Sequence, residues 1–305
     1  MLNKVLFLVG PTAVGKTGVA LELSKKIPLE VISCDSMQIY KELNIISNKP
    51  QQKILKRMPH HLINVVSVKR EYNVADFREQ ALKAIKAIHK KDKIPLIVGG
   101  SGLYMSLILD GIFRGAKKDL QFRSLLNQQA KIYGSLYLHN RLKKIDPQAA
   151  QIIHPNDLKR IIRALEVYEL TKQPISNLKS ERKGIWGKFD IQIFGLLCER
   201  EELHNRINAR VEIMFRAGLL KEIKAVLKKT LSLTSSYCLG IREIKGYFAG
   251  QYDLAEAKRL IKQNSRRYAK RQMTWFRKDK RINWIKITND DTPKNIAKRI
   301  LAKIE

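Results

Sequence analysis

Cysteine is scarce in this chain, and its spacing excludes two classes of small protein. The three cysteines, Cys34, Cys198 and Cys238, include no Cys-x-x-Cys pair among 305 residues. Disulfide-stapled scaffolds and cysteine-based zinc fingers need more cysteines at characteristic spacings, so both are excluded. We therefore expect a reduced compartment, the cytoplasm, as the setting of this protein.

Long apolar runs are also missing. The most apolar window, residues 94–113, is interrupted by Pro95, Gly99, Gly100, Gly102 and Asp110. A membrane-spanning helix needs about 20 consecutive, mostly apolar residues. This window instead indicates a strand, a loop and a buried helix, and we expect no membrane partner.

Acidic residues are few relative to basic ones. The chain has 28 Asp and Glu against 59 Lys and Arg, a net charge of +31. Such an excess predicts a polyanionic partner, with nucleic acid as the first candidate, because phosphate contacts dominate those affinities. A lysine-rich bias spread over the solvated surface would give the same total. The densest segment, residues 258–281, holds eleven basic residues against the single acid Asp279.

The first hundred residues alternate short apolar strands with helices. We predict strands at residues 5–9, 30–34 and 96–98, and a helix at 17–26. Asn73 and Asp76 resemble a capping box that opens another helix, whose residues 77, 81, 84, 85 and 88 share an apolar face. Continuous apolar strands between helices predict a parallel sheet covered on both faces.

The middle of the chain has a different character. Strand signals vanish after residue 117 and return at 190–197, while residues 123–133, 136–145 and 158–171 have helical spacing. We therefore expect a helical insertion domain at 117–189. It would interrupt a core of residues 1–116 and 190–305, whose C-terminal part is helical and basic.

A complete phosphate-binding loop follows the first predicted strand. It consists of Gly10, Pro11, Thr12, Ala13, Val14, Gly15, Lys16 and Thr17. Backbone N–H groups of such a loop cradle phosphates, the lysine adds a charge, and the hydroxyl of Thr17 can bind Mg²⁺, the cofactor we expect. The position of this loop between a strand and a helix predicts an α/β fold with a P-loop NTPase-like parallel sheet. We expect the loop to bind a diphosphate or a nucleotide such as ATP.

An acidic residue ends the second predicted strand. An ordinary P-loop ATPase has a further strand that ends in Asp, but the strand at 96–98 ends in glycine. Asp35 instead follows the strand at 30–34, which we place next to the phosphate loop. A carboxylate there could be a general base or support a metal. Alternatively, Asp35 only caps the helix that follows.

Several further blocks occur in a specific order along nearly the whole chain. They are Gly10–Thr17, Asp35–Lys41, Lys49-Pro50, Gly99–Tyr104, His154–Asp157, Arg163–Val167, Gly240–Glu243 and Lys270–Arg277. Together they resemble the tRNA dimethylallyltransferase family, also called the tRNA isopentenyltransferase or IPP transferase family. The chain departs from it at Ile46-Ser47-Asn48, where Gly-Thr-x is usual before Lys-Pro.

The resemblance implies an enzyme, a prenyltransferase that modifies tRNA. It would transfer a dimethylallyl group from dimethylallyl diphosphate to the exocyclic N6 amine of adenosine 37, next to the anticodon, and release pyrophosphate. Asp35 would be the base, Thr17 would contact the diphosphate and Arg210 would reach the pyrophosphate. Arg206 lies on the same helical face as Arg210, and either arginine alone would pass for a surface charge. We expect a monomer.

The resemblance also implies contacts with the tRNA anticodon stem-loop. They are Asp35, Ser36, Met37, Gln38, Ser101, Arg123, Lys159, Arg160, Arg163, Tyr237, Cys238, Leu239, Gly240, Ile241 and Arg242. The basic residues at 159–163 lie opposite the apolar face of their helix, as a merely solvated face also would. In residues 266–277 we expect Tyr268, Trp275 and Phe276 to anchor the core while the cations face phosphate.

Two other functions are compatible with parts of this pattern. A P-loop kinase of a nucleotide or small hydroxyl substrate would use Asp35 as the base for phosphoryl transfer, and would need no basic segment at 258–281. A non-catalytic RNA-binding protein with a vestigial phosphate loop would keep its function when Asp35 is replaced by Asn.

Overall fold

The computed structural model describes residues 3–113 and 118–304, which form two compact units. The larger unit comprises the chain up to Ile108 and from Trp186 onward, and the smaller unit is Leu109–Ile185. The boundary that we expected between residues 116 and 117 lies outside the described residues. No helix among the described residues combines the length and the apolarity needed to cross a membrane.

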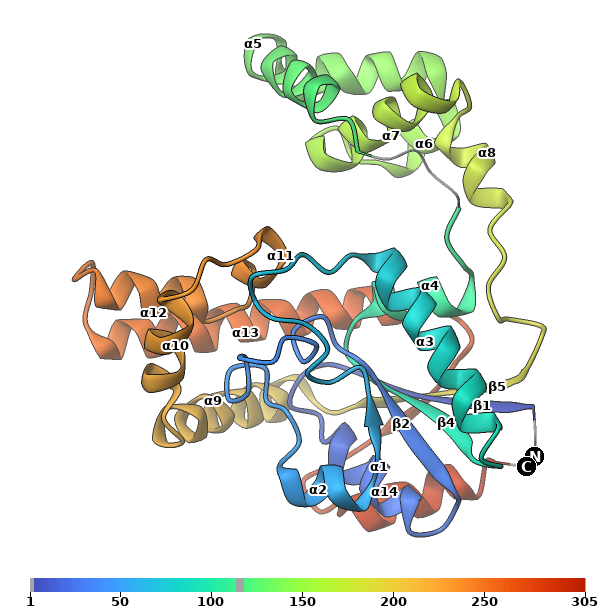
Figure 1. Cartoon of the computed structure of the whole chain (residues 1–305), viewed down its shortest axis with the longest axis vertical. Coiled ribbons are helices and arrows are strands. Elements are labelled where there is room, and N and C mark those ends of the chain that lie inside the picture. Colours follow the sequence, from blue (N-terminus) through green and yellow to red (C-terminus); the bar gives the residue numbers. More distant parts are fainter. Residues whose placement is uncertain (1–2, 114–117, 305) are drawn as a thin grey trace. The chain divides into compact units, whose positions relative to one another are not determined.

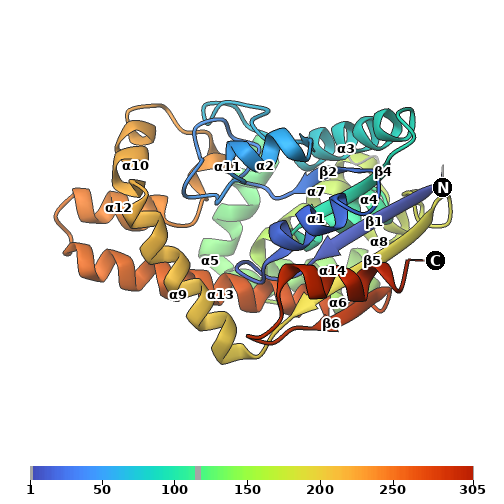
Figure 2. The same ribbon diagram turned by 90° about the horizontal axis from the view of Figure 1, so that it is seen from below.

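A six-stranded, wholly parallel sheet forms the centre of the larger unit (Figures 1 and 2). The strands are β1 (Lys4–Val9), β2 (Leu29–Cys34), β3 (His60–His61), β4 (Ile94–Gly99), β5 (Asp190–Leu197) and β6 (Ile282–Lys286). The predictions at 5–9, 30–34, 96–98 and 190–197 are confirmed, and so is the α/β fold class. Two edge strands were not predicted from the sequence: β3, which is only two residues long, and β6.

The strand order β3-β2-β4-β1-β5-β6 corrects the expected position of Asp35. β4 lies between β2 and β1, so the strand before Asp35 is not next to the strand before the phosphate loop. The intervening strand ends in Gly99, where an added Cβ would lie 2.0 Å from the carbonyl oxygen of Cys34. A glycine is therefore required where β4 passes between the two functional segments.

Helices cover both faces of the sheet (Figure 1). On one face α1 (Lys16–Ser24) packs beside α14 (Pro293–Leu301), and both contribute to a core that includes Leu6, Leu96 and Leu196. On the other face lies α3 (Val74–His89). Its predicted capping box is confirmed, with the Asn73 side chain accepting hydrogen bonds from the backbone of Ala75 and Asp76.

The other helices of the larger unit come mostly from its C-terminal part. They are α2 (Gln52–Arg57), α4 (Gly102–Leu109), α9 (Arg200–Arg216), α10 (Leu219–Leu227), α11 (Leu233–Ser236), α12 (Ile241–Phe248) and α13 (Leu254–Phe276). α13 packs along α9 and α12. The prediction for its aromatic residues is only partly right. Phe276 is buried, but Trp275 is 41% exposed, and Tyr268 lines a pocket.

The smaller unit is entirely helical within its described residues. It contains α5 (Leu120–Ile145), α6 (Pro147–Ile152), α7 (Leu158–Thr171) and α8 (Ile175–Ser180). α5 is interrupted at Gly134, whose φ is 80°, which agrees with the two separate helices predicted at 123–133 and 136–145. α7 has the predicted bounds, and the side chain of Asp157 accepts a hydrogen bond from the backbone of Arg160 at its start.

A fully buried carboxylate holds two arginines in the smaller unit. Glu166 accepts hydrogen bonds from Nε and Nη2 of Arg123, both at 2.7 Å, from Nη1 of Arg163 at 2.6 Å and from the backbone of Asp119. Burial raises the pKa of Glu166, but these hydrogen bonds outweigh it and lower the pKa to about 2. Two of the four expected RNA-contacting cations of this unit are thus fixed by one carboxylate.

Replacing Glu166 by Gln should destabilise the smaller unit by about 3 kcal/mol at pH 7, because the variant leaves two guanidinium groups against a neutral amide. The pKa of about 2 lies below the ordinary value of a glutamate. The stability from this ionised group is therefore complete above about pH 4.5 and is lost as the pH falls through 2. The difference between wild type and variant should shrink over that range.

Urea unfolding at pH 7, 5 and 3, followed by hydrogen exchange of the α7 amides, measures this difference. Glu169→Gln is the matched control, because Glu169 lies on the same helix in an exposed pair with Lys172. We expect it to change stability by less than about 0.5 kcal/mol. A Glu166→Gln effect that stays constant as the pH falls toward 2 would contradict the assigned ion cluster.

Candidate active site

The phosphate loop between β1 and α1 has the backbone that its glycines predict. Gly15 directly precedes α1 with a φ of 96°, a backbone conformation that residues with a Cβ rarely adopt. The first N–H groups of α1 have no intrahelical partner and are available to an anion. The sequence Gly-Lys-Thr thus places Lys16 and Thr17 in the first turn of a helix.

Lys16 lies inside the site rather than on the surface. Its Nζ donates hydrogen bonds to the carbonyl oxygens of Gly10 at 2.9 Å and Pro11 at 2.7 Å. Burial, helped by the charge of Arg210, lowers the pKa of Lys16 to about 7, while Asp35 acts in the opposite direction. An added anion would favour the charged form of this amine.

Asp35 is held by one of its two carboxylate oxygens. Oδ1 accepts hydrogen bonds from the backbone N–H groups of Met37 at 2.8 Å and Gln38 at 3.3 Å. Asp35 therefore caps a turn. The alternative expected a helix to follow, but the chain forms turns there and α2 begins only at Gln52. Burial raises the pKa of Asp35, although these hydrogen bonds and the nearby cations oppose the shift. Within the described chain its side-chain hydrogen bonds all end at Oδ1, which leaves Oδ2 without a partner there.

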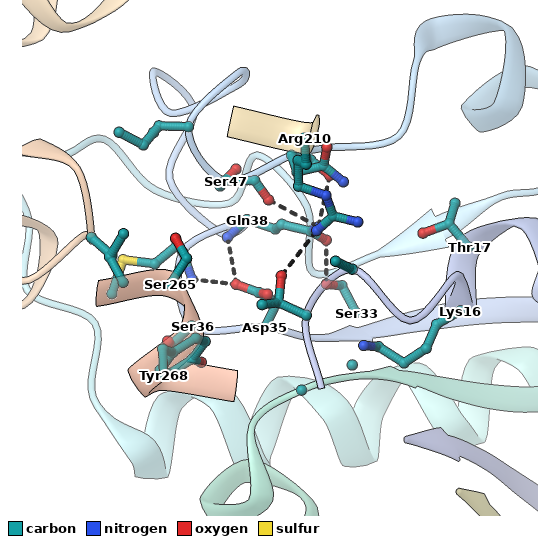
Figure 3. Close-up of a pocket in the computed structure, with 18 of the residues that line it drawn as sticks. Lys16, Thr17, Ser33, Asp35, Ser36, Gln38, Ser47, Arg210, Ser265 and Tyr268 are labelled. Carbon is teal, nitrogen blue, oxygen red and sulfur yellow. Dashed lines mark hydrogen bonds between the residues drawn. The ribbon is translucent and has the colours of Figure 1, made fainter. Parts of the chain in front are cut away.

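One cavity of about 400 Å³ brings the predicted catalytic residues together. Asp35, Thr17 and Arg210 all line it, together with Lys16 (Figure 3). A volume of this size is typical of small-molecule sites. Although β4 separates their strands, the phosphate loop and Asp35 thus share one pocket.

Arg210 comes from α9 and points to the phosphate loop. Its Nη1 donates a hydrogen bond to the hydroxyl of Thr12 at 2.9 Å. Arg206, one turn earlier, pairs with Glu202 and donates to the carbonyl of Thr288. The two arginines, which the sequence could not tell apart, thus have different partners, and only Arg210 lines the cavity.

The segment that departs from the family pattern forms another part of the wall. Gln38 accepts a hydrogen bond from the hydroxyl of Ser33, and its amide donates to the carbonyls of Ser47 and Asn48. The carboxylate of Glu222 accepts hydrogen bonds from three successive backbone N–H groups, those of residues 44–46. These contacts hold the segment without the usual glycine.

About half of the predicted tRNA contacts lie at this cavity. It is lined by Asp35, Ser36, Met37, Gln38, Tyr237, Cys238 and Leu239. Ser101 precedes α4, and its backbone N–H donates to the carbonyl of Cys34. Gly240 precedes α12, where Ile241 is buried and Arg242 is exposed. Arg123, Lys159, Arg160 and Arg163 belong to the smaller unit.

Other lining residues were not identified from the sequence. α13 contributes Ser265, Tyr268, Arg271 and Gln272. A signal for Gln272 was present, because Ala269, Gln272 and Phe276 follow the i, i+3, i+7 spacing of a buried helix face. In the same basic segment, Lys258 and Lys262 both pair with Glu212, so part of this charge is neutralised within the protein.

The donor set limits the kind of metal that the site could hold. No three His, Cys, Asp or Glu side chains gather as a metal site among the described residues. The loop offers the hydroxyl of Thr17 at the cavity. Mg²⁺ commonly binds through few protein oxygens, water and substrate phosphates. The residues therefore fit a Mg²⁺ that is bound together with a diphosphate.

Sequence comparisons point to one family. The IPP transferase family profile matches residues 38–279. Relatives from Halothermothrix orenii and Carboxydothermus hydrogenoformans, both named tRNA dimethylallyltransferase, are 43% and 44% identical to this chain. The first alignment covers 96% of this chain and 90% of the relative, and the second covers 100% and 97%.

Solved structures agree over the same length. A full-length tRNA isopentenylpyrophosphate transferase from Bacillus halodurans is 37% identical, with a TM-score of 0.71, and the match covers 99% of this chain and 96% of that one. A eukaryotic dimethylallyltransferase acting on tRNA is 29% identical, with a TM-score of 0.84, and the match covers 98% and 78%.

The environment of Lys16 makes its titration measurable. Because burial lowers its pKa to about 7, the neutral and nucleophilic amine should predominate above that pH. Labelling by a trace of acetic anhydride at different pH values, read by mass spectrometry, should give a Lys16 rate that reaches half of its plateau near pH 7. Exposed lysines of the same protein correct for reagent decay. A Lys16 rate that still rises steeply above pH 9 would contradict the assigned environment.

Proposed function

The chain belongs to the IPP transferase family, and we propose how its cavity carries out the family's reaction. The enzyme transfers a dimethylallyl group from dimethylallyl diphosphate to the N6 amine of adenosine 37 in tRNA, giving N6-(dimethylallyl)adenosine and pyrophosphate. Relatives named tRNA dimethylallyltransferase match the chain almost from end to end. They give no support to the alternative of a P-loop kinase.

One observation carries the assignment of chemistry to residues. A carboxylate, Asp35, and a diphosphate-binding set, Lys16, Thr17 and Arg210, line the same cavity. Prenyl transfer to an amine needs both, since the prenyl donor releases an anion and the amine releases a proton. In the RNA-binding alternative with a vestigial loop, this convergence has no use.

The diphosphate end of the cavity stabilises the leaving group. The bond between C1 of the dimethylallyl group and the diphosphate oxygen breaks, and its electron pair goes to pyrophosphate. The N–H groups at the start of α1, the ammonium of Lys16 and the guanidinium of Arg210 face that developing charge. Mg²⁺, bound by the Thr17 hydroxyl and the diphosphate, would neutralise further negative charge.

Asp35 acts at the other end. The N6 nitrogen forms the new bond to C1 and loses a proton, which Oδ2 of Asp35 accepts. The backbone hydrogen bonds to Oδ1 fix the orientation of the carboxylate, and burial strengthens it as a base by raising its pKa. The adenine must leave its stack to reach this buried group.

The RNA is bound through cations of both units and through residues at the cavity. Lys159 and Arg160 are exposed on α7, and Glu166 holds Arg123 and Arg163 in place. These side chains contact the anticodon stem-loop, and residues 35–38 and 237–242 contact the nucleotides near the target base. The enzyme acts as a monomer in the cytoplasm, where tRNA is abundant.

Replacing Asp35 by Asn should abolish most of the activity while RNA binding persists. The amide keeps the shape but cannot accept the proton, so we expect kcat/KM to fall by at least about 100-fold. The assay combines protein, dimethylallyl diphosphate and an anticodon stem-loop with adenosine at position 37, and detects the prenylated nucleoside. Asp290→Asn, at an exposed turn, is the control. Full activity in Asp35→Asn would refute the base assignment.

The double variant Lys159→Gln, Arg160→Gln should weaken RNA binding and its dependence on salt. If both cations contact phosphates, the slope of log Kd against log salt should decrease by about 1 to 2. Filter binding at several salt concentrations measures it. Lys83→Gln, which removes an exposed charge on α3, should leave the slope unchanged. An unaltered slope in the double variant would remove these residues from the interface.

A further inference from the structure

A buried amide joins three segments that are distant in the sequence. Gln272, on α13, is 6% exposed. Its Oε1 accepts a hydrogen bond from the backbone N–H of Thr12 at 2.9 Å, and its Nε2 donates to the carbonyl of Gly100 at 2.9 Å. One side chain therefore connects the phosphate loop, the end of β4 and the helix that carries the basic segment.

The fit around this amide is tight. A Cβ added at Gly100 would lie 2.2 Å from Nε2 of Gln272, so a larger residue at that position would displace the amide. On the loop side, Thr12 is held a second time, because its hydroxyl accepts a hydrogen bond from Arg210. The conformation of Thr12 thus depends on α9 and α13, both far along the chain from the loop.

The two hydrogen bonds need a group that donates and accepts at once. A primary amide does so at every pH, whereas a carboxyl group does so only when it is protonated. A buried polar group without a hydrogen-bond partner destabilises the fold. A side chain that lacks either the donor or the acceptor would therefore break the link between the loop and β4.

We propose that Gln272 is a positioning residue that fixes the phosphate loop in the conformation that binds diphosphate. The inference rests on the proposed function only in taking the anion of this cavity to be a diphosphate. Gln272 uses the N–H of Thr12, so it acts through the loop rather than by touching the anion with its own donor. The same link makes the shape of the loop depend on the position of α13.

The test compares two replacements, one that never makes the two hydrogen bonds and one that makes them only when it is protonated. Gln272→Met keeps the length and fits a buried position, but makes neither hydrogen bond at any pH. Gln272→Glu makes both when its carboxyl is protonated, and when ionised it loses the donor and adds a negative charge. Gln263→Met, on the same helix and partly exposed, is the matched control.

The probe is inorganic pyrophosphate with Mg²⁺, and its affinity is measured by calorimetry between pH 6 and 8.5. Each affinity is expressed relative to wild type at the same pH. The titratable side chains that line the cavity are present in every variant, so this ratio removes their shared effect. They are Lys16, Asp35, His60, Arg210, Tyr237, Cys238, Tyr268 and Arg271. Melting temperatures establish that the variants are folded.

We expect Gln272→Met to bind pyrophosphate about tenfold more weakly than wild type at every pH. Gln272→Glu should bind at least tenfold more weakly at pH 8.5, where its carboxyl is ionised, and any protonation toward pH 6 should reduce that deficit. Gln263→Met should match wild type. Wild-type affinity in Gln272→Met, or wild-type affinity in Gln272→Glu at pH 8.5, would overturn the proposal.

The binding readout separates this inference from the proposed function. If wild type binds pyrophosphate and the variants behave as expected, but no RNA is prenylated, then the proposed function fails and the role of Gln272 stands. If RNA is prenylated and Gln272→Met retains full affinity for pyrophosphate, the role of Gln272 fails and the proposed function stands.

Discussion

The burial of Lys16 close to the charge of Arg210 is the constraint on which the rest of the site depends. Both cations line one partly buried cavity, where burial and mutual charge lower the pKa of Lys16 to about 7. Such a pair is unfavourable until an anion arrives, and the nearby carboxylate of Asp35 compensates only part of it. The cavity is therefore suited to a ligand with at least two negative charges. A diphosphate carries at least that charge.

A loop that places Lys16 near the guanidinium of Arg210 needs support from outside itself. β1 and α1 provide only the two ends of the phosphate loop. α9 supplies Arg210 to the hydroxyl of Thr12, and α13 supplies Gln272 to its N–H. The C-terminal helices thus hold the phosphate loop as well as carrying basic charge. The hydrogen bond between Thr12 and Gln272 thus joins residues 260 positions apart.

The sequence was sufficient to predict features that depend on interactions between residues close together in the chain. The phosphate loop, the capping box at Asn73 and the bounds of α7 were predicted, because each depends on neighbours within a few residues. The order of the strands was not, since the pairing of β4 between β1 and β2 depends on contacts between distant segments. Within the site, Asp35 and Arg210 were assigned through the resemblance. Gln272 was missed because no local pattern distinguishes a bridging amide from a packed one.

The basic residues behind the net charge of +31 have different partners, and only some of them are candidates for RNA contacts. Lys16 and Arg210 serve the cavity, and Glu212 neutralises two lysines of α13. In the smaller unit Glu166 fixes two arginines, which lowers the entropy that they would lose on meeting a phosphate. A buried acid that holds cations in place can strengthen RNA binding while reducing the net charge. The count of basic residues is therefore a weaker guide to the interface than the acids with which they pair.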